Sequence, residues 1–112
     1  MIIYACSGGS NLGQLSNDVA KGLSMEGKGR MSCLAGVGAH VSTIVESGRA
    51  ASDVLAIDGC GLCCAKKALE HVGITVTRHV VLTDLGIEKS YDLSRCDEHI
   101  EKVRRLVTGR IA

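Results

Sequence analysis

Apolar residues along this chain alternate between short continuous runs and stripes with helical spacing. Residues 1–5 form the first run and predict a buried strand. The next apolar residues recur every three or four positions, as they do on one face of a helix, and they are Leu12, Leu15, Val19 and Leu23. Ser10 or Asn11 is suited to cap this helix, and the glycines within residues 27–29 predict its end.

The same alternation continues through the middle of the chain. A short strand is predicted around residues 30–34. A second helix follows and ends near Gly48, and its apolar positions are Val37, Val41, Ile44 and Val45. Residues 53–58 form a nearly continuous apolar run, which is typical of a strand buried on both faces. A third helix is predicted to end at Gly73, with its stripe at Leu62, Ala65, Leu69 and Val72.

The last part of the chain completes the pattern. Residues 74–82 predict a fourth strand, and residues 83–93 predict a loop or a partial element. Ser94 with Asp97 resembles a capping box before a final helix whose stripe is Ile100, Val103, Leu106 and Val107. The order βαβαβαβα predicts a three-layer α/β fold, Rossmann-like or flavodoxin-like. It has a four-stranded parallel sheet with helices on both faces and right-handed crossovers.

The composition and the net charge indicate the number of domains, the type of core and the classes of partner to expect. The 112 residues are expected to form a single domain, residues 1–112, with an aliphatic core because there are 2 Tyr and neither Phe nor Trp. The net charge is +1 and the basic residues are scattered, so we expect no nucleic-acid partner and no membrane surface. No apolar run approaches the roughly 20 residues that span a bilayer. The N-terminus does not resemble a signal peptide, and a cytoplasmic location is expected.

Three of the 6 cysteines are equally spaced, and each stands at or just after a predicted strand and before a predicted helix: Cys6, Cys33 and Cys60. Parallel strands end at one edge of a sheet, where ligands bind in folds of this kind. Cysteines in a reducing compartment indicate metal or redox chemistry more than structural disulfides. The sequence therefore predicts a zinc site at this edge, with Cys63 or Cys64 as the fourth ligand.

Other chemistries remain open for these residues. An iron–sulfur cluster is an alternative cofactor, because four cysteines also suit iron. Cys60-Gly-Leu-Cys63 follows a strand and opens a helix, as in thiol–disulfide oxidoreductases, although the chain has no proline to stand opposite the motif. Cys6 begins a glycine-rich turn that is similar to the loop of cysteine-based phosphoryl-transfer proteins, and Leu12 occupies the place of the phosphatase arginine.

Several polar residues are expected near the same edge. Asp58 is interpreted as a hydrogen-bond acceptor for a helix N–H group or as a group that supports the metal ligands. Lys66 and Lys67 are interpreted as a solvated helix face. His79 interrupts an apolar strand and is interpreted as structural, and Cys96 as an ordinary helix residue.

The motifs Cys6–Ser10, Met31–Gly36, Asp58-Gly59-Cys60, Cys64–Lys67 and Leu82–Ile87 run through most of the chain. In combination they resemble the DGC-domain family, a set of small proteins described as zinc-binding. The resemblance implies four chelating cysteines, which map onto Cys6, Cys33, Cys60 and Cys64. Cys64 takes the fourth place because it directly precedes Ala-Lys-Lys, and Cys63 is then a spare thiol or an alternate ligand. Four thiolates leave no open position on zinc, so no catalysis is predicted.

Overall fold

The computed structural model describes residues 1–95 and 99–111. These residues form a four-stranded sheet with the strand order β2-β1-β3-β4, and each pair of neighbouring strands is parallel. The strands are β1 (Ile2–Ala5), β2 (Arg30–Met31), β3 (Val54–Asp58) and β4 (Arg78–Val81). This order is that of flavodoxin-like sheets, in which the chain reverses its direction of travel between β1 and β3. The predicted α/β fold with a parallel sheet is confirmed.

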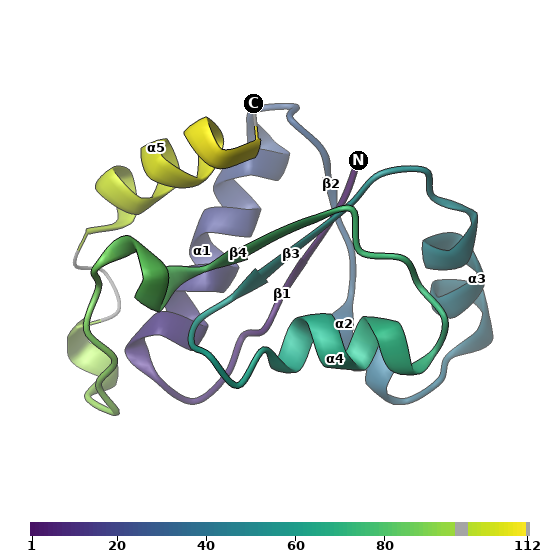
Figure 1. Ribbon diagram of the computed structural model, residues 1–112, viewed down its shortest axis with the longest axis horizontal. Helices are drawn as coiled ribbons and strands as arrows, with labels where there is room; N and C mark the ends of the chain where they lie inside the picture. Colours follow the sequence, from purple (N-terminus) through teal and green to yellow (C-terminus); the bar gives the residue numbers. More distant parts are fainter. Residues whose placement is uncertain (96–98, 112) are drawn as a thin grey trace.

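Helices cover both faces of the sheet (Figure 1). One face carries α1 (Asn11–Met25) and α5 (Ile100–Ile111). The other carries α2 (Leu34–Gly38), α3 (Ser42–Ala50) and α4 (Cys64–His71). The short 3-10 helices η1 (Leu82–Leu85) and η2 (Leu93–Arg95) follow β4. Among the described helices, none has both the length and the apolar character needed to cross a membrane.

The alternation of side chains along β1 and β3 divides the core in two. Ile3, Leu55 and Ile57 pack against α1 and α5, whereas Tyr4 and Ala56 face the opposite helices. Both central strands are buried along their whole length, as the continuous apolar runs predicted. The sheet is thereby held between two aliphatic layers, and only its edges and ends are available for chemistry.

Several element boundaries differ from the prediction. The strand expected at residues 30–34 is limited to two residues, because Cys33 already caps α2. The single helix expected up to Gly48 is two helices, α2 and α3, separated at His40, whose φ of 58° is incompatible with a continuous right-handed helix. Leu62 lies before α4 and is 61% exposed, so it does not belong to the buried stripe.

The C-terminal third shows two further differences. β4 begins at Arg78 and not at residue 74, although Ile74 is buried beneath α3 and α4. In α5 the buried residues are Val103, Val107 and Ile111, whereas Leu106 is 39% exposed. The predicted capping box depends on Asp97, which, like Cys96, lies outside the described residues.

Candidate metal centre

The cysteines lie at the carboxyl end of the sheet, on both sides of the point where the strand order reverses. Cys6 directly follows β1, and Cys60 follows β3 after the single residue Gly59. Cys33 stands after β2 as the N-cap of α2, and Cys64 is the first residue of α4. Crevices at such a reversal are the usual ligand sites of open parallel sheets.

Two adjoining pockets bring the four cysteines into one region. Cys6, Cys33 and Cys64 line the first pocket together with Asn17 and Ala68. Cys6 and Cys64 also line the second pocket, which is completed by Cys60. Within the described residues, no three of these four sulfur atoms lie within 4.8 Å of one another. The fold therefore gathers the thiols around shared pockets without closing them into a finished ligand shell.

Three of these sulfurs already have hydrogen-bonding neighbours. The amide N–H of Gly36 donates to Cys33 Sγ at 3.3 Å, and Lys89 Nζ donates to Cys60 Sγ at 3.5 Å. The Sγ of Cys6 lies 3.4 Å from Ser16 Oγ. The Gly36 amide and the Lys89 ammonium are donors that stabilise thiolates and can keep these bonds when the sulfur binds a metal. The residues present therefore fit a zinc ion, for which thiolate is a preferred ligand.

The loop after η1 contributes a neighbour that the sequence analysis missed. Lys89 Nζ lies 5.1 Å from the centroid of the Tyr91 ring. It also contacts Cys60, although the two residues are 29 positions apart in the sequence. Asn11 holds this loop, because its side chain donates to the Glu88 carbonyl and accepts from the Ser90 amide. No local motif marks Lys89, since its role depends on a contact between separate segments.

Asp58 is the most buried charged residue in the described part of the chain, with 1% of its surface exposed. Its Oδ1 accepts from the Ala65 amide at 2.7 Å, and its Oδ2 accepts from the Lys66 amide at 3.3 Å. Its Oδ2 also lies 2.8 Å from His79 Nε2. The prediction that Asp58 accepts a helix N–H bond is confirmed, and its pairing with His79 is an addition. Lys66 lies on the solvated helix face, 3.8 Å from the exposed Glu70.

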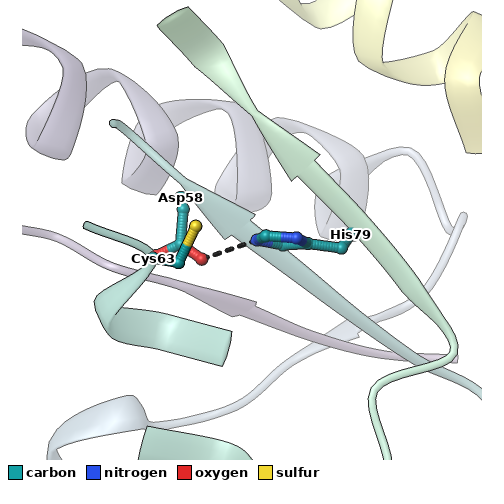
Figure 2. Close-up of side chains that lie close together, drawn as sticks. All are labelled: Asp58, Cys63 and His79. Atoms are coloured by element: carbon teal, nitrogen blue, oxygen red, sulfur yellow. Dashed lines mark hydrogen bonds and ion pairs between the residues drawn. The ribbon is translucent and has the colours of Figure 1, made fainter. Parts of the chain in front are cut away.

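Cys63 does not line the shared pockets, and its side chain lies beside this carboxylate (Figure 2). It has a φ of 54°, in the left-handed region, and it precedes α4 as an N-cap without a side-chain cap bond. Burial, and then the negative charge of Asp58, raise the pKa of the Cys63 thiol. Single ligand atoms of Asp58, Cys63 and His79 all lie within 4.8 Å of one another. This mixed cluster was not predicted from the sequence.

Comparison with known proteins places the chain in a family. A protein from Pseudomonas aeruginosa (strain PAO1), the anaerobic and virulence modulator AnvM, is 42% identical over 90 residues, which are 80% of this chain and 69% of AnvM. No solved structure matches significantly. The sequence profile of the DGC domain matches residues 2–107. The motifs at the sheet edge and this nearly full-length match lead to one conclusion: the chain belongs to the DGC domain family.

Proposed function

We propose that this protein binds one zinc ion through the thiolates of Cys6, Cys33, Cys60 and Cys64. The observation that carries the proposal is that the four cysteines line two adjoining pockets with two residues in common. Cys6 and Cys64 line both of them, one with Cys33 and the other with Cys60. Thiolates bound to one zinc at about 2.3 Å lie roughly 3.8 Å apart. Rotation of the side chains and small shifts of the glycine-rich turns are expected to close the shell.

A closed shell of four thiolates supports a binding role and not catalysis. Zinc bound in this way supplies structural stability and holds separate segments together. AnvM is named a modulator. A zinc site without an open coordination position suits a protein that modulates others and does not catalyse a reaction. We extend only this expectation, of a non-catalytic role, to the present chain. A cytoplasmic location, which keeps the thiols reduced, belongs to the same proposal.

Metal analysis of the purified protein tests this proposal. We expect about one zinc per chain in protein purified without chelators, and we expect its loss in Cys33→Ser. Cys96→Ser is the matched control, because Cys96 falls outside the family motifs, and it should keep the zinc. Absence of stoichiometric metal, together with unchanged stability of Cys33→Ser, would contradict the proposal.

The same preparation separates the alternatives. Iron with sulfide and visible absorption would indicate a cluster in place of zinc. Metal-free protein with a reversible Cys60–Cys63 disulfide would indicate an oxidoreductase. A phosphate adduct on Cys6 would indicate phosphoryl transfer.

A further inference from the structure

A second group of ligand atoms lies beside the four cysteines and shares none of them. Asp58 ends β3, His79 belongs to β4, and Cys63 stands in the turn before α4 (Figure 2). These three elements meet because β3 and β4 pair in parallel and α4 packs on β3. We propose that Asp58, Cys63 and His79 form a second metal site, which takes a divalent ion of the zinc type.

The distances need little adjustment for such an ion. The three ligand atoms lie within 4.8 Å of one another, and the Asp58 and His79 atoms are 2.8 Å apart. Zinc bonds of about 2.0–2.3 Å place tetrahedral ligands roughly 3.3–3.8 Å from one another. Zinc binding therefore requires the imidazole and the carboxylate to separate slightly, while the thiol already lies within 4.8 Å of both. The ion takes the place of a proton on His79 Nε2, which moves to Nδ1 of a neutral ring or passes to solvent from a protonated one, and the thiol proton passes to solvent.

Two of the ligands are already held in place. Asp58 is fixed by the amide N–H groups of Ala65 and Lys66, and these bonds leave its oxygens further lone pairs. The His79 ring is oriented by Asp58, and 20% of the side chain is exposed, so a route from solvent exists. Ligands positioned by the surrounding structure lose little freedom when an ion binds.

The backbone at Cys63 is the independent observation that supports the site. Cys63 is a non-glycine residue with a φ of 54°, a strained backbone conformation that is common at functional sites. Within the described residues, the Cys63 thiol has no hydrogen-bond partner. The left-handed turn directs Cys63 toward Asp58, while the next residue, Cys64, lines the pockets with Cys6. The strain is explained if the thiol is needed as a ligand.

The donor set selects the class of ion. One thiolate, one imidazole and one carboxylate suit zinc and chemically similar ions, whereas calcium and magnesium prefer oxygen ligands alone. Three protein ligands leave a fourth position for water or another ligand. This open position distinguishes the site from the closed four-thiolate shell, and the two sites share no ligand.

Cobalt titration tests the second site. Protein containing one equivalent of zinc is titrated with Co²⁺, whose bonds to thiolate absorb in the near ultraviolet. The wild type should bind one further equivalent with this absorption. His79→Gln should weaken cobalt binding more than about 100-fold, because a direct ligand is lost. Removal of a residue that only hydrogen-bonds to a ligand typically weakens metal binding about 10–100-fold. His71→Gln is the matched control and should bind as the wild type does.

Cys63→Gly removes the thiol ligand without destabilising the fold, so a loss of cobalt binding in this variant cannot be due to unfolding. Glycine accepts a positive φ without strain, so this variant should be at least as stable as the wild type. It should nevertheless lose the near-ultraviolet band. The proposal is overturned if the wild type binds no further cobalt or if binding persists in both variants. Loss of binding in His71→Gln would overturn it too, and would assign the ion to the exposed His40 and His71 rings, whose centroids are 5.5 Å apart.

The two proposals fail separately. Cys33 takes no part in the second site, so Cys33→Ser should lose the first ion and keep the cobalt band that depends on His79. If the four-thiolate shell does not exist, the wild type should bind a single equivalent, and that equivalent should disappear in His79→Gln.

Discussion

Gly59, the middle residue of Asp58-Gly59-Cys60, shows how a single residue brings separate turns together. A Cβ atom at this position would lie 2.8 Å from the Leu12 carbonyl carbon and 2.9 Å from the Gly13 amide nitrogen. Backbone atoms cannot give way as a flexible side chain does. The turn that carries Cys60 can therefore approach α1, which follows the Cys6 turn, only because residue 59 has no side chain.

Gly59→Ala is expected to separate these two turns. We expect a loss of about 1–3 kcal/mol in the free energy of unfolding, as for other overpacked positions. Zinc affinity should fall by at least about tenfold, because the ligands on the two turns move apart. Gly61→Ala is the matched control, since a Cβ there meets nothing within 4 Å. Urea denaturation and competition with a chelator measure the two effects, and equal behaviour of the two variants would refute this role for Gly59.

At the scale of elements, the junctions are made by side chains that reach across the chain. Ser10 caps α1 locally, and its Oγ accepts from the Gly13 amide at 3.0 Å. The start of α4 has no local side-chain cap, and Asp58 at the end of β3 takes this role instead. Asp58 also reaches His79 in β4, so one carboxylate joins two strands and a helix.

At the other end of β3, Asp53 and Thr77 join the starts of two strands. The Thr77 hydroxyl lies 2.7 Å from Asp53 Oδ1 and also accepts from the Val54 amide at 2.9 Å. The hydrogen bond from Thr77, and then the positive charge of Arg78, lower the pKa of Asp53. Because this pKa is lower in the folded state, ionised Asp53 stabilises the fold above the unfolded-state value, about 3.9. That stabilisation is lost as pH falls through the folded-state pKa.

Thr77→Val removes the hydroxyl and keeps the branched shape. The pKa of Asp53 should therefore rise toward its ordinary value, and the variant should lose less stability than the wild type between about pH 4 and pH 2. Titration of the Asp53 carboxyl carbon by NMR measures the pKa directly. Identical Asp53 titrations in the two proteins would show that Thr77 does not perturb this group.

At the scale of the whole molecule, two helical layers enclose the sheet and leave the cysteines at its end. α5 closes the outer layer beside α1, on the face away from α4 (Figure 1). Val103 and Val107 of α5 are fully buried there against the sheet and α1. α5 itself contributes no residue to the two pockets or to the proposed ligands, so its packing should affect stability and leave metal binding intact.

Val107→Ala tests this division of roles. Removal of two buried methyl groups should lower the free energy of unfolding by about 1–3 kcal/mol and leave the zinc content unchanged. Leu106→Ala is the matched control, because Leu106 is partly exposed, and it should cost less than about 1 kcal/mol. Urea denaturation with metal analysis measures both properties. A loss of zinc in Val107→Ala while the protein remains folded would show that the layers are coupled.

The sequence by itself determined the alternation of strands and helices and the edge of the sheet at which the cysteines lie. Apolar runs such as residues 54–58 and helical stripes such as that of α1 are local patterns, and their alternation requires a parallel sheet. The strand ends then bring Cys6, Cys33 and Cys60 to one edge without any knowledge of the strand order. Cys64 as a fourth ligand was chosen by family resemblance, since periodicity did not separate it from Cys63.

Only the tertiary structure decided the contacts that join distant segments. The pairing of Asp58 with His79 and the approach of Lys89 to Cys60 depend on strand order and on the path of a loop. The break at His40 and the late start of β4 likewise reflect the packing of neighbouring elements over the local apolar pattern. Local patterns record which face of each element is buried. Which element packs against that face depends on the packing free energy of the entire chain, and a short stretch of sequence does not determine it.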